Sequence, residues 1–296
     1  MLNLVIGFAT CGRADILKDT LNDVARQTRL PDKILLSPID PERDLDLSNI
    51  NELIAGRVQI VTGPPGLTAQ RNTILKHLSD KDVVLFLDDD FVMHELYSEE
   101  LMKLFEINPE VAGHSGRVLA DGVNSGGIDF DEALCITKNY TDPIIYQTDN
   151  HGTTYGCNMA FRVSSVKRYG IKFDENLPLY GWFEDLDFSA SLAKKEIVIN
   201  SKQCMGVHMG VKSGRSPGYR LGYSQVVNPI YIARKGNMLW SEAVLNVIKR
   251  TLANLFRSIK PESWVDRKGR FMGNLKGIYD LLLGKSDPKK ILEFKK

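Results

Sequence analysis

Three consecutive carboxylates, Asp88, Asp89 and Asp90, follow directly on an unbroken apolar run, residues 83–87 (VVLFL). A continuous apolar run of this kind predicts a strand that is buried on both faces and therefore central in a sheet. Ligands of open α/β sheets bind outside the carboxyl ends of the strands, which is where these acids stand. Crowded negative charges need a cation, and oxygen ligands suit Mg2+ or Mn2+, so we expect a divalent metal here. An acidic turn exposed to solvent is the alternative.

A second pair of acids, Glu184 and Asp185, enters a predicted helix within the segment 181–187 (GWFEDLD). A carboxylate at the mouth of a cleft can accept the proton of a hydroxyl nucleophile, and Trp182 beside it can stack on a sugar ring. Acids in the first turn of a helix are also favoured by the helix dipole, and tryptophan is often buried in a core. Helix capping next to a core tryptophan is therefore the alternative to a catalytic pair.

A histidine and an arginine could complete such a site. His208 lies between glycines in the segment 206–210 (GVHMG), although a lone histidine is more often structural than a ligand. Arg71 lies near the start of a predicted helix, after the rigid turn 63–66 (GPPG), where its guanidinium can meet a nucleotide or a surface carboxylate. The sequence contains neither G-x-G-x-x-G nor G-x-x-x-x-G-K-[ST], which argues against dinucleotide and P-loop binding.

Strand and helix patterns alternate over the first 90 residues. Strands are predicted at residues 4–9, 33–39, 58–61 and 83–87, and helices at residues 15–27 and 68–78. This alternation is typical of βαβ units, so the expected fold class is α/β with a central, mainly parallel sheet. The later elements are less regular: strands at 111–119, 159–163, 197–199 and 205–208, and helices at 98–107 and 185–194. The basic, turn-rich segment 212–222 (KSGRSPGYRLG) is expected to be a flexible loop.

The end of the chain differs from the rest in charge and pattern. Residues 241–296 carry 13 Lys and Arg against 6 Asp and Glu, a net charge of +7, whereas residues 1–240 carry −6. One face of a predicted helix, 241–259, bears an apolar stripe of Val244, Ile248, Leu252, Leu255 and Ile259. The stripe either packs on the rest of the protein or lies in an anionic membrane interface. We therefore divide the chain into a catalytic domain, 1–240, and a basic amphipathic helical tail, 241–296, with a second tail helix near 275–283.

The composition is that of an ordinary globular protein, with 43% apolar and 25% charged residues. The four cysteines are widely spaced, which favours reduced thiols in the cytosol. The apolar start, residues 2–10, lacks the basic region and cleavage site of a signal peptide, and no stretch has the ~18–20 apolar residues that span a bilayer. We expect a cytoplasmic protein, at most peripheral on the inner face of the cytoplasmic membrane, with no nucleic-acid partner.

Taken in order, these segments resemble glycosyltransferase family 2, a large inverting family with the GT-A fold. The matching segments are 8–13 (FATCGR), the first strand and nucleotide loop; Asp40, a base-contacting acid after the second strand; 69–72 (AQRN), an A-R-N segment; 87–90 (LDDD), the DxD motif; 156–162 (GCNMAFR), the donor-sugar strand; 184–187 (EDLD), the E-D-x-D segment; and 207–208 (VH), the late metal-binding histidine. The resemblance covers about residues 3–235.

The resemblance implies a nucleotide-binding α/β/α sandwich with a C-terminal helical extension. It implies transfer with inversion from a nucleotide-diphosphate sugar, such as a UDP-sugar, to a hydroxyl of a glycan or lipid-linked acceptor. Asp185 would be the general base with Glu184 beside it, and Asp90 and His208 would hold Mn2+ or Mg2+. The donor nucleotide would be bound by the remaining motif residues: Thr10, Arg13, Asp40, Arg71, Asp88 and Asp89. The basic loop, with Lys212, Arg215 and Arg220, would close over the diphosphate.

Two other functions fit part of the pattern. Residues 88–92 (DDDFV) also match the D-x-D-x-[TV] motif of haloacid-dehalogenase-like phosphatases, in which Asp88 would be the nucleophile and Asp90 the acid and base. That motif normally sits on the first strand of the chain, whereas two βα units precede it here. A non-catalytic module that binds sugar nucleotides is the second alternative, although both acidic groups and His208 are intact.

Overall fold

The computed structural model describes residues 1–140, 147–149, 152–213 and 217–294. The chain forms two compact units, which we describe separately. The sheet unit comprises residues 1–65, 69–172 and 191–214, and the helical unit comprises residues 66–68, 173–190 and 215–296.

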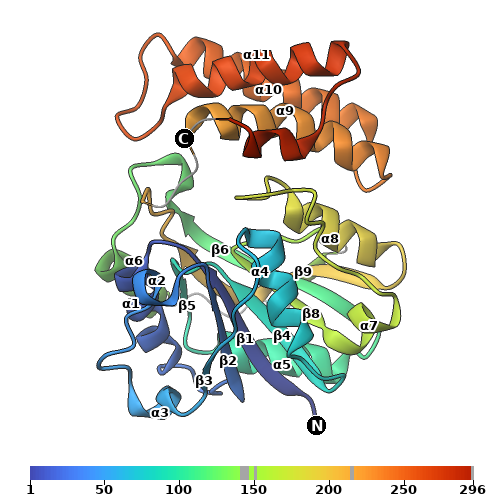
Figure 1. Ribbon diagram of the computed structural model, residues 1–296. Coiled ribbons are helices and arrows are strands. Elements are labelled where there is room, and N and C mark those ends of the chain that lie inside the picture. The colour runs from blue at the N-terminus through green and yellow to red at the C-terminus, as the bar shows by residue number, and fades with distance from the viewer. Residues whose placement is uncertain (141–146, 150–151, 214–216, 295–296) are drawn as a thin grey trace. The chain divides into compact units, whose positions relative to one another are not determined.

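The first half of the sheet unit is a parallel sheet (Figure 1). Its strands are β1 (Asn3–Thr10), β2 (Lys33–Pro38), β3 (Val58–Ile60) and β4 (Asp82–Leu87). They lie in the order β3-β2-β1-β4, and every residue of β4 is buried. The continuous apolar run therefore does form a central strand, as predicted. The α/β fold class with a largely parallel central sheet is confirmed.

The second half of the sheet continues in the order β4-β8-β6-β9-β5. Its main strands are β5 (Phe91–Met93), β6 (Val111–Asp121), β8 (Asn158–Arg162) and β9 (Ile197–His208), and the short β7 (Thr148–Asp149) pairs with β9. The two strands predicted at 197–199 and 205–208 are one strand, which pairs with β6 up to Asn200 and again from Met205, with a register shift between these two residues. Strand β5 was not predicted, since three residues carry no readable pattern.

Helices cover both faces of the sheet. On one face, Leu4, Ile6 and Phe8 of β1 join a core with Leu17 and Leu21 of α1 (Ala14–Val24) and with side chains of α5 (Tyr97–Ile107). On the other face, a Cβ at Gly7 would lie only 3.1 Å from Ile74 of α4 (Leu67–Lys76), so glycine permits this close approach. The layers are therefore α/β/α. The shorter helices of the unit are α2 (Pro41–Asp44), α3 (Glu52–Ala55), η1 (Gly122–Asn124), α6 (Phe130–Lys138) and α7 (Val163–Arg168).

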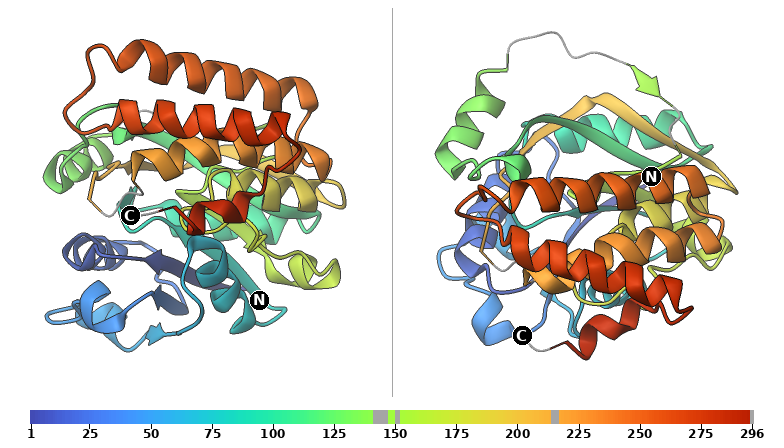
Figure 2. Two further views of the ribbon diagram at one scale, coloured as in Figure 1. Left: turned by 45° about the horizontal axis from the view of Figure 1, so that its top comes forward. Right: turned by 90° about the horizontal axis from the view of Figure 1, so that it is seen from above.

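The helical unit contains the start of α8 (Glu184–Ala193), followed by α9 (Gly218–Arg234), α10 (Trp240–Arg257), α11 (Arg267–Leu282) and η2 (Pro288–Leu292). Helices α10 and α11 run side by side (Figure 2), and both pack against α9. A Cβ at Gly222 of α9 would lie 2.0 Å from the Arg270 carbonyl, and one at Gly273 of α11 would lie 2.1 Å from the Tyr219 carbonyl. Glycine thus lets α9 and α11 approach closely.

The predicted flexible loop at 212–222 is wrong from Gly218 onward, because α9 begins there and includes Arg220. Arg215 lies outside the described residues. Helix α9, which falls on the catalytic side of the predicted boundary after Trp240, belongs to the same compact unit as α10 and α11. Among the described residues, no helix combines the length and apolar character needed to cross a membrane.

Candidate active site

Two carboxylates and one imidazole converge at the end of the central strand. Asp88, Asp90 and His208 each offer a ligand atom, and these atoms lie within 4.8 Å of one another. The chain brings them together because β5 follows directly on the three acids and pairs antiparallel with the end of β9, where Phe91 is opposite His208. The unpredicted strand β5 is therefore what places the histidine beside the acids.

The contacts of Asp90 leave one oxygen directed at the cluster. Its Oδ2 accepts a hydrogen bond from the Val211 amide at 2.8 Å. Its Oδ1 lies 3.4 Å from Nε2 of His208, and it is a buried oxygen with no hydrogen-bond partner among the residues described. Asp88 Oδ2 lies 3.8 Å from the same nitrogen, and its side chain is 31% exposed. Two carboxylates, one imidazole and an unsatisfied buried oxygen suit a divalent cation.

The other side of the His208 ring is held by Asp121, the last residue of β6. His208 Nδ1 donates to Asp121 Oδ1 at 3.0 Å, and Tyr155 donates its hydroxyl proton to Asp121 Oδ2 at 2.9 Å. This bond orients the ring and aims Nε2 at Asp88 and Asp90, which is the usual support of a metal-ligating histidine. Burial alone would lower the pKa of His208, but the hydrogen bond to Asp121 and the negative charges of Asp90 and Asp88 raise it to about 10.

Asp89, the middle acid, points away from the cluster. It is 5% exposed, accepts from Thr10 Oγ1 at 2.8 Å through Oδ2, and accepts from Arg13 at 2.8 Å through Oδ1. Burial raises the pKa of Asp89 to about 6, against the opposing effect of Arg13. Arg13 also donates to the Val211 carbonyl at 3.2 Å and so ties the first loop to the segment after His208. Thr10, Arg13 and Asp89 thus form an internal network, and their predicted contact with a nucleotide stays a prediction.

Arg71 and Asp40 occupy different surroundings. Arg71 is 2% exposed and donates to the Gly156 carbonyl at 3.0 Å and to Asp88 at 3.3 Å. It therefore links α4 to the predicted donor-sugar segment and to the acidic cluster. Asp40 is exposed and caps α2 by accepting from the Glu42 amide. A nucleotide contact of either residue stays a prediction.

Sequence reasoning missed two acids that the structure places at this edge of the sheet. Asp121 ends a strand that was predicted to stop two residues earlier, so the rule that sites lie at carboxyl ends of strands could have found it. Asp44 is fully buried and accepts from the amides of Gly12 at 2.7 Å, Ile39 at 3.0 Å and Asp40 at 2.8 Å. It holds together the loops that follow β1 and β2. Its short helix gave no signal in the sequence.

Glu184 and Asp185 lie in the helical unit, at the start of α8. Of the three acids in this turn, Glu184 and Asp187 are buried, at 5% and 2% exposed, whereas Asp185 is partly exposed. Asp187 is engaged by Lys235 Nζ at 2.6 Å and by Asn237 Nδ2 at 2.7 Å. It therefore anchors the turn, and Asp185 is the most exposed of the three acids.

The backbone before α8 is unusual. Leu179 and Phe183 have φ angles of 60° and 69°, a left-handed conformation that side chains larger than glycine rarely adopt. Such positions concentrate at functional sites, where the surrounding structure maintains the strain. Trp182 lies between them, and the Arg250 guanidinium is 5.3 Å from the centre of its ring. One face of the tryptophan predicted to stack on a sugar is thus next to a cation.

Two residues of the predicted basic loop are held by the protein. Lys212 Nζ donates to the carbonyls of Gly122 at 2.7 Å and Val123 at 3.1 Å. Arg220 lies on α9 and donates to the Phe294 carbonyl. Arg220 is therefore part of a packed helix and does not belong to a closing loop.

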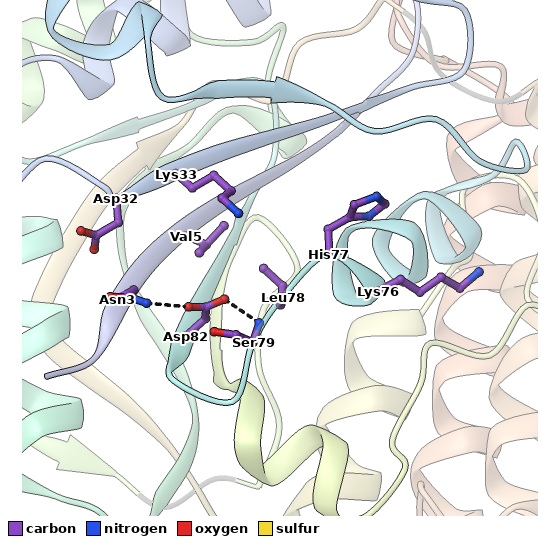
Figure 3. Close-up of a pocket in the computed structure, with 9 residues that line it drawn as sticks. All are labelled: Asn3, Val5, Asp32, Lys33, Lys76, His77, Leu78, Ser79 and Asp82. Atoms are coloured by element: carbon purple, nitrogen blue, oxygen red, sulfur yellow. Dashed lines mark hydrogen bonds between the residues drawn. The ribbon is translucent and has the colours of Figure 1, made fainter.

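A cavity of about 340 Å³ lies at the opposite edge of the sheet, near the starts of β1 and β4 (Figure 3). Asp82 in its wall accepts from Asn3 Nδ2 at 3.0 Å and from the Ser79 amide at 2.7 Å, so this carboxylate is engaged in joining the strand ends. The cavity contains none of the clustered acids. A second cavity, about 420 Å³, is lined by Tyr155 together with Ser115, Thr154 and Asn200, and it adjoins the tyrosine that supports Asp121.

Comparison with known proteins supplies the family. The model of Glycosyl transferase family 2 matches residues 6–170, more than half of the chain. The protein belongs to glycosyltransferase family 2. No curated protein matches the sequence. Among solved structures, S. aureus TarS 1-349 is 15% identical, covers 98% of this chain and 82% of its own, and has a TM-score of 0.56.

A second solved structure is GalNAc-T7 with UDP, GalNAc and Mn2+, which is 13% identical with a TM-score of 0.58 and covers 99% of this chain and 58% of its own. At such identities the likeness shows the fold, which is GT-A as predicted. The chain is therefore a glycosyltransferase with the GT-A fold, and its activity is glycosyl transfer. The phosphatase and the non-catalytic module are set aside by this result.

Proposed function

We propose that this glycosyltransferase is metal-dependent and inverting, and that it moves a sugar from a nucleotide-diphosphate sugar, in the first instance a UDP-sugar, to a hydroxyl of a glycan or lipid-linked acceptor. The observation that carries the proposal is the convergence of Asp88, Asp90 and His208 on one point at the end of β4. GalNAc-T7, which shares the fold, was crystallised with UDP and Mn2+, and this supports the same donor chemistry here. We place the enzyme in the cytoplasm, at most peripheral on the inner face of the cytoplasmic membrane.

A divalent cation, Mn2+ or Mg2+, bound by Asp88, Asp90 and His208 would neutralise the charge that develops on the leaving diphosphate. The protein's own residues prepare this site. Asp121 holds the His208 ring so that Nε2 faces the two carboxylates. Arg13 and Thr10 hold Asp89 away, so that the cluster contains two carboxylates instead of three.

Asp185 is proposed as the general base. In a single displacement with inversion, it would take the proton of the acceptor hydroxyl as the oxygen attacks the anomeric carbon. Its partial exposure, beside the buried Glu184 and the ion-paired Asp187, supports this choice within the helical unit. Glu184 lies beside the base and would shape its surroundings.

The base is tested by comparing two variants. Asp185→Asn should lower transfer by ~100-fold or more while donor binding is kept, since general bases typically contribute ~10²–10⁴. Glu184→Gln should lower it less. The readouts are turnover and the thermal stabilisation by donor with Mn2+, because a bound ligand raises the melting temperature. Wild-type turnover in Asp185→Asn would show that another group takes the proton, and the reverse ranking would move the role to Glu184.

The inverting outcome is tested on the product. The anomeric configuration of the transferred sugar, followed by NMR during turnover, should be opposite to that of the donor. Retention of configuration would contradict the single displacement.

A further inference from the structure

Helix α10 presents large apolar side chains to solvent. The predicted stripe is not packed: Val244, Ile248, Leu252, Leu255 and Ile259 are between 38% and 85% exposed. Leu245 and Phe256 extend the same side of the helix, at 48% and 65% exposed. Exposed apolar residues scattered singly are ordinary, but a contiguous apolar patch is uncommon on a soluble monomer and marks an interaction site.

Helix α11 continues this feature. Met272, Leu275, Tyr279 and Leu282 recur at the spacing of one helix face and are 55%, 42%, 58% and 82% exposed. The opposite side of α11 bears Gly273, through which it packs closely on α9. Because α10 and α11 run side by side (Figure 2), we treat their exposed apolar side chains as one surface and call it the apolar face.

A buried polar network fixes which side of α10 is turned outward. Asn254 is 1% exposed and donates to Gln225 of α9 at 3.0 Å and to Asn274 of α11 at 2.9 Å, while Arg267 donates to its oxygen at 3.0 Å. Turning the helix to bury its apolar stripe would break these bonds and leave polar groups unsatisfied. The exposure of the apolar face is thus specified by the fold of the helical unit.

Exposed basic side chains accompany the apolar residues in this unit. Lys249 follows Leu245 by four residues on α10, so it lies next to this apolar neighbour on the same helix surface. Lys260 lies just beyond the end of α10 at Arg257, and both lysines are exposed. Further exposed lysines in this unit are Lys268, Lys285 and Lys289. Residues 241–296 carry a net charge of +7. Apolar side chains flanked by lysines are the signature of a helix that lies in the interface of an anionic bilayer.

We propose that the apolar face of α10 and α11 binds an anionic membrane surface. The apolar side chains would enter the boundary between headgroups and acyl chains, while the flanking lysines would meet anionic headgroups. The charge favours this occupant over a second copy of the chain, because two copies would bring surfaces of like charge together. The inference rests on the proposed function only in that it names where a lipid-linked acceptor would be met.

The test is sedimentation of the full chain with phosphatidylcholine vesicles of increasing phosphatidylglycerol content, without donor or acceptor. Binding should rise with anionic lipid and fall with salt. Lys249→Gln with Lys260→Gln should weaken partitioning roughly 30-fold, because each basic residue near the surface contributes about 1 kcal/mol. Ile248→Asp with Leu252→Asp should abolish it. Ile107→Asp, at a residue 75% exposed on α5, is the matched control and should leave binding unchanged.

Three outcomes would overturn the proposal. The full chain does not sediment with anionic vesicles at low salt, or all variants bind as the control does. Alternatively, light scattering shows that the wild type is a dimer and that the Ile248→Asp and Leu252→Asp variant is a monomer. The apolar face would then be a subunit interface. Because vesicle binding requires no turnover, failure here leaves glycosyl transfer untouched, and loss of transfer leaves vesicle binding untouched.

Discussion

Replacing Asp121 tests whether His208 acts as a metal ligand with a carboxylate behind it. Asp121 Oδ1 accepts from His208 Nδ1 at 3.0 Å, so the carboxylate both orients the ring and increases the basicity of Nε2. Asp121→Asn keeps an oxygen in place but removes the charge, whereas Asp121→Ala removes both. Loss of such a partner weakens metal affinity by roughly 10–100-fold, or about 1.4–2.8 kcal/mol. We expect the lower figure for Asn and the higher for Ala.

The assay is calorimetric titration of Mn2+ in the presence of a nucleoside diphosphate, with circular dichroism to show that the fold is intact. Tyr155→Phe is the matched control: it removes only the 2.9 Å bond to the far oxygen of Asp121 and should change the Mn2+ affinity less than either Asp121 variant. Wild-type Mn2+ affinity in Asp121→Ala would refute the reasoning, since the ring would then need no carboxylate to serve the metal.

Three further predictions concern stability. Burial holds the pKa of His114 at about 3, below its ordinary 6.5, so only the unfolded chain takes up this proton as pH falls from 7 to 5. In urea titrations the unfolding free energy of the wild type should therefore fall by about 2 kcal/mol more between pH 7 and 5 than that of His114→Gln. Equal pH dependence of the two unfolding free energies would contradict this. Lys235→Met leaves the buried Asp187 without its ammonium partner and should lower the unfolding free energy by about 2 kcal/mol in denaturant titrations. The figure is kept low because Lys235 is 31% exposed and solvent screens the pair. An unchanged denaturation midpoint would show that the hydrogen bond from Asn237 is enough to hold Asp187. Gly273→Ala puts a methyl group 2.1 Å from a carbonyl of α9 and should lower the melting temperature by an amount equivalent to about 1–3 kcal/mol, whereas a neutral result would mean that α9 and α11 can separate freely.

The parts of the fold that the sequence predicts are those with long, regular patterns. The apolar run before Asp88 predicted a central strand, and β4 is buried along its whole length. Strand β5 has only three residues, yet it positions His208 opposite Phe91, so the convergence of the cluster could not be derived from spacing. Three acids in a row also give no sign of which one points away from the metal-binding cluster. That depends on Arg13, whose contact with Asp89 is made only in the folded chain.

Helix α9 begins in a segment whose sequence predicted a flexible loop. Its first residues contain two glycines and follow a proline, which is a turn-like composition, and Pro229 lies inside the helix. Tertiary packing overrides this local preference, because Gly222 is what allows α9 to lie against Arg270 of α11. The sequence likewise predicted the apolar stripe of α10 but not its exposure, since that is decided by the buried contacts of Asn254 with α9 and α11.

The most direct test of the central claim is the release of nucleoside diphosphate from a panel of nucleotide sugars, measured with Mn2+, with Mg2+ and after chelation, for the wild type and Asp90→Asn. Asp90 supplies the buried Oδ1 that faces His208 at 3.4 Å, so its loss should remove metal-dependent turnover while the fold remains. The account predicts release from at least one donor in the presence of metal and acceptor, with none after chelation and a strong reduction in Asp90→Asn. Release that persists after chelation and in Asp90→Asn would contradict it.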